Sequence, residues 1–179
     1  MAPTALLHPF SPPALGPEGY INIVSGNGAV VSDDKGNDYI DAMASLWYCN
    51  VGYSRREVIE AITTQLNKIP AYHVFGPFAN EPSEQLAARI AALAPVDDAR
   101  VFFGSSGSES VDTALKIARA AQIHAGHPEK QIVISRSAGY HGTNYGGTSA
   151  QGIQLNREGF GDRLQNHIVV PQDDVEALA

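Results

Sequence analysis

A run of serine and glycine, residues 105–108, lies between an apolar stretch and an amphipathic segment. The apolar stretch, residues 100–103, predicts a strand, and the pattern after it predicts a helix over residues 106–125. Hydroxyl groups and unpaired N–H groups at the start of a helix bind anions such as phosphate, and glycine lets a ligand approach closely. Ser106 and Glu109 also have capping-box spacing, so the alternative is that Ser106 only caps the helix.

A second glycine-rich loop, residues 138–147, follows the next predicted strand, residues 131–135. Gly139 and Gly142 flank a tyrosine and a histidine in this loop, so its backbone can present an aromatic ring. Ligands of open α/β sheets bind at the carboxyl ends of the strands, so we expect this loop beside the serine turn. An aromatic ring next to a phosphate can stack on a planar cofactor. The alternative is a surface loop with an incidental tyrosine.

Two other motifs fit the serine turn less well. A Walker loop needs a lysine after its second glycine, and no lysine follows Gly107. The nucleophile elbow of a hydrolase has the pattern G-x-S-x-G, and Ser108 occupies the place of its last glycine. A serine hydrolase with Ser106 as nucleophile and His141 or His167 as base is therefore the rival from another enzyme class.

Strands and helices alternate in the second half of the chain, with a third strand expected at residues 167–170. This alternation is typical of an α/β fold with a mostly parallel sheet. Parallel sheets need cover on both faces and at their edges. Three strands do not supply that cover, so we expect the front portion of a larger domain.

The first half of the chain predicts a different arrangement. Short strands joined by turns are expected over residues 21–42, and helices over residues 54–69 and 82–94. Ser54 and Glu57 have the spacing of a capping box at the start of the first helix.

Composition narrows the class of protein. The 179 residues carry a net charge of −7, and 44% of them are hydrophobic. An acidic chain without a basic patch argues against nucleic-acid and anionic-membrane partners, and no apolar run is long enough for a membrane span. The single cysteine, Cys49, is typical of a reducing compartment, so we expect a cytoplasmic protein. His124 and His127 lack a third ligand nearby, so we expect no metal site.

Three motifs together resemble the class III aminotransferases, which use pyridoxal phosphate on the type I fold. They are VFFGSSGSESVDTALKIAR, GYHGTNYGGT and, upstream, DAMASLWYCNVGY. The resemblance runs from about Gly28 to Ala179 and is closest to the ω-amino acid or amine:pyruvate branch. It implies a three-layer α/β/α fold of which this chain is the N-terminal portion. It also implies an N-terminal arm with small-domain strands over residues 1–45, and part of the large cofactor-binding domain over residues 46–179.

The resemblance assigns roles to individual residues. The cofactor-binding residues match the family's phosphate cup, the tyrosine against the cofactor ring and the histidine after it: Ser106, Gly107, Ser108, Tyr140 and His141. The substrate-pocket residues include an aromatic that enters from the partner subunit of a homodimer, Phe75; the others are Leu46, Trp47 and Thr143.

The resemblance also implies groups that are not in this sequence. None of Lys35, Lys68, Lys116 and Lys130 lies in the family's Schiff-base context, so no catalytic residue is assigned. The parent enzyme would transfer an amino group from an amine or ω-amino acid to a keto acid such as pyruvate. This chain alone is expected to be an inactive fragment of it. The alternative within the family is a non-catalytic relic that binds phosphate or forms dimers.

Overall fold

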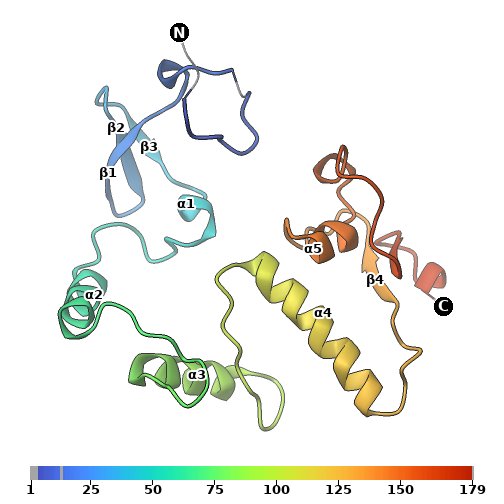
Figure 1. Ribbon diagram of the computed structural model, residues 1–179. Coiled ribbons are helices and arrows are strands. Elements are labelled where there is room, and N and C mark those ends of the chain that lie inside the picture. The colour runs from blue at the N-terminus through green and yellow to red at the C-terminus, as the bar shows by residue number, and fades with distance from the viewer. Residues whose placement is uncertain (1–3, 13, 179) are drawn as a thin grey trace. The chain divides into compact units, whose positions relative to one another are not determined.

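The structure is a computed structural model that describes residues 4–12 and 14–178 (Figure 1). The chain divides into two compact units, Met1–Asn80 and Glu81–Ala179, and each has a small sheet of its own. The domain boundary expected after residue 45 stays a prediction.

The first unit contains a three-stranded antiparallel sheet. Its strands are β1 (Ile23–Asn27), β2 (Val30–Asp33) and β3 (Asp38–Ile40), paired in that order. They confirm the short strands expected over residues 21–42. Gly28 has a φ of 57° in the two-residue connection between β1 and β2, a conformation that glycine adopts readily.

The remaining elements of the first unit are short apart from one helix. They are η1 (Pro17–Gly19), α1 (Ala44–Trp47) and α2 (Arg56–Lys68). The helix α2 is confirmed, but its predicted capping box is wrong. Its N-cap residue is Arg55, which makes no side-chain cap. Ser54 has a φ of 63°, and its hydroxyl donates to the carbonyl of Gly26 at 2.9 Å, away from the helix.

The apolar side of α2 remains open to solvent. Val58, Ile62 and Leu66 recur at helical spacing and are 44%, 55% and 53% exposed. An apolar stripe of this width normally packs against another element. Within residues 4–12 and 14–178, no element covers this stripe fully, because each of the three residues remains more than 40% exposed.

The second unit combines helices with a parallel pair of strands. Its elements are α3 (Glu81–Leu93), α4 (Gly107–His124), β4 (Val133–Arg136), α5 (Tyr145–Ala150), η2 (Gln154–Asn156), β5 (His167–Val170) and η3 (Glu176–Leu178). The strands β4 and β5 run parallel with Val133 opposite His167 and Arg136 opposite Val170. The two strands expected near residues 131–135 and 167–170 are therefore confirmed.

The buried part of this unit lies where α5 meets the strands. Ser135 of β4 is buried and its hydroxyl donates to the carbonyl of Ala150. Ser149, Ala150 and Gln151 are at most 4% exposed. The small residues of α5 therefore let it pack directly on β4 and β5.

One predicted strand is wrong. Residues 100–103 belong to no sheet, and Phe102 and Phe103 are 67% and 43% exposed. A strand requires a hydrogen-bonded neighbour, and no strand among the described residues pairs with this stretch. Across the described part of the chain, no helix has both the length and the apolarity to cross a bilayer.

Candidate functional site

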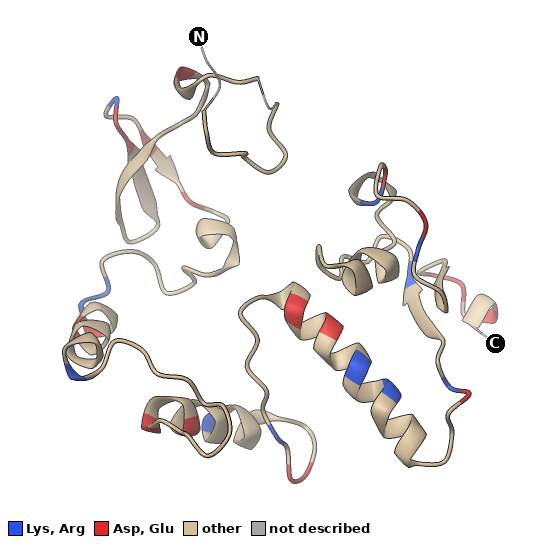
Figure 2. Ribbon diagram, in the orientation of Figure 1, with Lys and Arg blue, Asp and Glu red and all other residues tan. Residues whose placement is uncertain are grey.

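The start of α4 is built by a side-chain cap. The hydroxyl of Ser106 accepts a hydrogen bond from the backbone N–H of Glu109 at 3.2 Å. The Glu109 carboxylate accepts the N–H of Ser105 at 2.7 Å. Ser106 is therefore confirmed as the cap of α4. The second hydrogen bond of the capping box differs from the expected one, because the Glu109 carboxylate accepts from Ser105 and not from Ser106. Acidic residues lie near the start of α4 and basic residues further along, which complements the helix dipole (Figure 2).

The first N–H groups of α4 are available to a ligand. Among the described residues, no hydrogen-bond acceptor is paired with the backbone N–H of Gly107 or Ser108. A Cβ built on Gly107 would have no atom within 4 Å, so the space beside this residue is open. Unpaired donors at a helix N-terminus with open space before them suit a phosphate group.

The second glycine-rich loop lies directly on this turn. The backbone N–H of Thr143 donates to the Ser108 hydroxyl at 2.8 Å, and the two hydroxyl oxygens are 3.2 Å apart. Gly142 has a φ of 106°, and a Cβ there would lie 2.7 Å from the Ser108 hydroxyl oxygen. Only glycine allows the loop to cross Ser108 this closely. The Ser108 hydroxyl keeps its hydrogen, which can donate to Thr143 or to a bound anion.

The structure therefore joins two of the predicted groups of residues. Ser108 and Thr143 touch across the turn and the loop. Tyr140 and His141 lie in the same loop; the Tyr140 side chain is 58% exposed, whereas His141 is half-buried. An exposed ring in a loop that contacts the first turn of α4 fits a flat phosphorylated ligand.

One residue near this site was missed by the sequence reasoning. Asp112 lies on α4 one turn after Ser108, and its carboxylate accepts the backbone N–H of Gly147 at 3.0 Å. The available signal was the spacing of Ser108 and Asp112 on one helix face, together with the Gly146–Gly147 pair at the end of the loop. Neither feature indicates a partner without knowledge of where α5 lies.

The predicted pocket residues Leu46 and Trp47 lie on α1, which is a left-handed turn. The φ values of Ala44, Ser45, Leu46 and Trp47 are 48°, 51°, 60° and 84°. Such a conformation costs about 1–2 kcal/mol for each residue that is not glycine. The turn presents Leu46 and Trp47 outward, 64% and 79% exposed.

The half-buried carboxylate of Asp41 supports this turn. Asp41 accepts the N–H of Ser45 and the hydroxyl of Tyr53, both at 2.7 Å. The hydrogen bond from Tyr53 lowers the pKa of Asp41, and the same bond raises the pKa of Tyr53. The third predicted pocket aromatic, Phe75, lies in the irregular segment after α2 and is 85% exposed.

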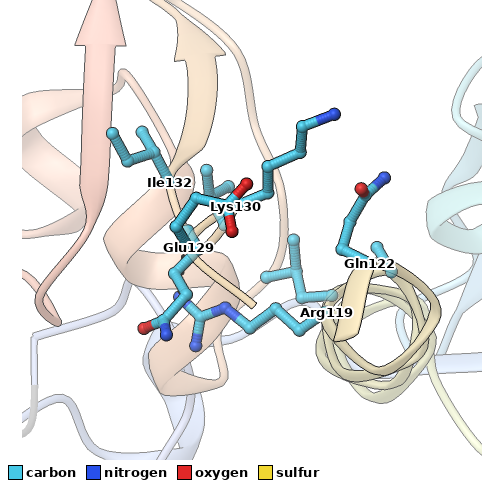
Figure 3. Close-up of a pocket in the computed structure, with 9 residues that line it drawn as sticks. Arg119, Gln122, Glu129, Lys130 and Ile132 are labelled. Atoms are coloured by element: carbon cyan, nitrogen blue, oxygen red, sulfur yellow. Dashed lines mark hydrogen bonds between the residues drawn. The ribbon is translucent and has the colours of Figure 1, made fainter. Parts of the chain in front are cut away.

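A separate hollow of about 460 Å³ lies beside the other half of α4 (Figure 3). It is bounded by residues of α4 and by residues 129–133. Arg119 reaches across it, and its guanidinium donates to the carbonyl of Gln131 at 3.0 Å. Its lining includes apolar and charged side chains. The hollow does not share residues with the turn that holds Ser106 and Ser108.

Known proteins are similar to this chain in sequence and in fold. The aminotransferase class-III family model matches residues 15–179. The chain belongs to the class III aminotransferase family. The β-alanine–pyruvate aminotransferase of Pseudomonas aeruginosa is 43% identical over 142 residues, which are 79% of this chain and 32% of that protein.

Solved ω-transaminase structures have a fold similar to that of this chain. The ω-transaminase of Pseudomonas jessenii, in complex with PMP, superposes with a TM-score of 0.86 at 38% identity, over 93% of this chain and 37% of that one. A thermostable variant with replaced tryptophan, phenylalanine and arginine, engineered for asymmetric synthesis of enantiopure bulky amines, has a TM-score of 0.86 at 37% identity, over 93% of this chain and 38% of that one. The predicted type I α/β fold is confirmed, and this chain represents part of it. The chain spans about a third of the length of the curated relatives it matches.

Membership of this family leaves little support for the hydrolase alternative. The Ser106 hydroxyl caps α4, and no histidine in residues 4–12 and 14–178 hydrogen-bonds to it. A serine nucleophile requires a base within hydrogen-bond reach.

Proposed function

We propose that this chain is the phosphate-binding and ring-contacting part of an aminotransferase that uses pyridoxal phosphate. The observation that carries the proposal is the contact between Ser108 and Thr143. It joins a helix start with open N–H donors to a loop with an exposed tyrosine, in a chain of the class III family. Pyridoxal phosphate, when bound, supplies the electron sink that amino-group transfer requires.

Each site residue has a proposed task. The N–H groups of Gly107 and Ser108, with the Ser106 and Ser108 hydroxyls, hold the phosphate through charge-assisted hydrogen bonds. The ring of Tyr140 lies against the pyridine ring, and His141 supports the loop behind it. These residues bind and orient the cofactor, and none of them is assigned a proton transfer.

The proposed reaction transfers an amino group from an amine or ω-amino acid to a keto acid such as pyruvate. Relatives named for putrescine and pyruvate, and for β-alanine and pyruvate, support this substrate class. Leu46, Trp47, Phe75 and Thr143 are proposed to line the substrate pocket. The tryptophan and phenylalanine replaced in the engineered relative are as far apart in its chain as Trp47 and Phe75 are here, which supports that assignment.

We also propose a homodimer, in which Phe75 contributes to the pocket of the other subunit, and a cytoplasmic location. The exposed apolar face of α2 supports association with further polypeptide. Light scattering of the purified chain tests the dimer, and a monomer at all concentrations would reject it.

Cell fractionation tests the proposed cytoplasmic location, and recovery of the protein in a membrane or secreted fraction would reject that location.

Binding of pyridoxal phosphate to the purified 179-residue chain tests the cofactor proposal. We expect saturable binding, measured by quenching of the Trp47 fluorescence or by equilibrium dialysis, with inorganic phosphate as a competitor. Ser108→Ala should weaken it by about tenfold, since one charge-assisted hydrogen bond is lost. Thr113→Ala, on the same helix, is the matched control and should leave binding unchanged. No saturable binding, or equal binding by Ser108→Ala, would reject the cup.

Reductive trapping separates binding from covalent chemistry. Borohydride treatment of the chain with pyridoxal phosphate should leave no single lysine stoichiometrically labelled, because none of the four lysines has the family's context. Lys116, exposed on α4, is the residue to monitor. Its stoichiometric labelling would overturn this expectation.

A further inference from the structure

The carboxylate of Asp112 caps a helix that has no cap of its own. The helix α5 begins after Asn144, whose side chain makes no cap hydrogen bond. The N–H of Gly147, the third residue of α5, donates instead to Asp112 at 3.0 Å. A carboxylate at this place satisfies an unpaired N–H and interacts well with the positive end of the helix.

Gly146 makes this contact possible. A Cβ at Gly146 would meet the Asp112 carboxylate oxygen, so any larger residue would displace that carboxylate from its place beside α5. Both helices pack against each other through this part of the chain. The bond between Asp112 and Gly147 is therefore part of a close helix contact.

The same face of α4 holds the loop at two points. Ser108 binds Thr143 near the middle of the loop, and Asp112, one turn later on α4, binds Gly147, the last residue of the loop. Residues four apart on a helix lie on one face. The loop that carries Tyr140 is thus attached to α4 by a hydroxyl and a carboxylate, both on the helix whose start offers the open N–H donors.

We propose that Asp112 is a positioning residue that holds the Tyr140 loop against the phosphate-binding turn. This inference rests on the proposed function, because it assigns Asp112 a task in seating the ring of pyridoxal phosphate. Asp112 does not touch the cofactor. It acts through α5 and the loop, so its removal affects ligands that have a ring more than ligands that have only a phosphate.

Two ligands test this split in the unmodified and mutated 179-residue chain. Asp112→Ala should lower the affinity for pyridoxal phosphate by about tenfold, since a charge-assisted hydrogen bond is lost, and leave that for inorganic phosphate within about twofold. Asp112→Asn keeps an acceptor oxygen and should restore most of the difference. Lys116→Ala, one turn further along α4, is the control and should change neither affinity. Of these three variants, only Asp112→Ala should show faster hydrogen exchange of the Gly147 amide than the unmodified chain.

The outcomes separate this role from the proposed function. An equal loss of both affinities in Asp112→Ala would overturn the positioning role, and so would unchanged exchange at Gly147. Absence of pyridoxal phosphate binding in the unmutated chain would reject the proposed function and this role together. Binding that Asp112→Ala leaves unchanged would reject the role alone.

A coupling experiment covers the case in which Asp112→Ala does not fold. Gly146→Ala alone should speed exchange at Gly147 and weaken pyridoxal phosphate binding, because the new methyl group displaces the carboxylate. In the Asp112→Asn background, Gly146→Ala should have a similar additional effect on exchange and binding, because the clash with the side chain remains. In an Asp112→Ala protein that folds, the additional effect of Gly146→Ala should be much smaller. Normal exchange at Gly147 in Gly146→Ala would overturn the inference without need of the alanine variant.

Discussion

The hydroxyl of Ser108 accepts the backbone N–H of Thr143 at 2.8 Å, across a separation of 35 residues in the chain. This bond attaches the glycine-rich loop to the first turn of α4. Two stretches that the sequence shows as separate glycine-rich segments therefore contact each other in the candidate site. The attachment depends on Gly142, whose backbone crosses Ser108 without room for a side chain.

Gly142→Ala should separate the loop from the turn. A Cβ at this position would lie 2.7 Å from the Ser108 hydroxyl oxygen and 2.8 Å from its Cα atom, so backbone has to move. We expect faster hydrogen exchange of the Thr143 amide and weaker binding of pyridoxal phosphate, by about tenfold. Gly126→Ala is the matched control, because Gly126 also has a positive φ but has open space around it. Both variants should lower the free energy of unfolding by about 1–2 kcal/mol, because alanine disfavours a positive φ. Equal binding of pyridoxal phosphate by the two variants would contradict the attachment of the loop to Ser108.

Ser106→Ala should weaken the start of α4. The lost bond to the Glu109 N–H is a helix cap worth about 1 kcal/mol. Urea unfolding of the chain measures the free-energy loss, and hydrogen exchange of the Glu109 amide locates it. Ser54→Ala is the informative comparison, because Ser54 has similar sequence spacing but donates to Gly26. It should leave exchange in the first turn of α2 unchanged, and a change there would mean that Ser54 caps α2 after all.

The turn between β2 and β3 should lose stability at acid pH. Asp33 accepts four hydrogen bonds, from Lys35, twice from Asn37, and from the Tyr39 hydroxyl. The hydrogen bond from the Asn37 side chain, above all, lowers the pKa of Asp33 from 3.8 to about 2.

The sign of the effect follows from that lowered pKa. The fold favours the ionised carboxylate, so its contribution is complete above the ordinary value of 3.8 and is lost as the pH falls towards 2. NMR shifts of the Asn37 and Tyr39 amides, followed over this range, check it. Asp33→Asn should remove the transition, whereas Asp34→Asn should keep it. A transition that persists in Asp33→Asn would assign it to another group.

Trp47→Gly should widen the proposed substrate pocket. The matched relative with a replaced tryptophan was engineered for bulky amines, and Trp47 is presented outward by α1. The measurement uses a chimaera in which residues 15–179 replace the matching part of the Pseudomonas jessenii ω-transaminase. We expect the ratio of kcat/KM for a bulky amine over a small amine to rise by about tenfold or more. Tyr48→Gly, the adjacent exposed aromatic, is the control. An unchanged ratio would remove Trp47 from the pocket.

The sequence by itself determined the local elements and the residue types of the site. Apolar residues at helical spacing were sufficient to predict α2, α3 and α4. Short stretches rich in isoleucine and valine were sufficient to predict β4 and β5, because both signals are carried by neighbouring residues. Ser106 was identified as the cap of α4 for the same reason. The family motifs added the expectation of pyridoxal phosphate and of the residues proposed to bind it.

Only the tertiary structure decided which local signals are used. Ser54 and Ser106 both precede a glutamate by three residues, yet only Ser106 caps its helix, because the β1 carbonyl of Gly26 takes the Ser54 hydroxyl. Residues 100–103 have the composition of a strand but no described neighbour with which to pair. The contact between Asp112 and Gly147 joins residues 35 positions apart. Such choices depend on which distant backbone groups reach a side chain, and a local pattern carries no information about that distance.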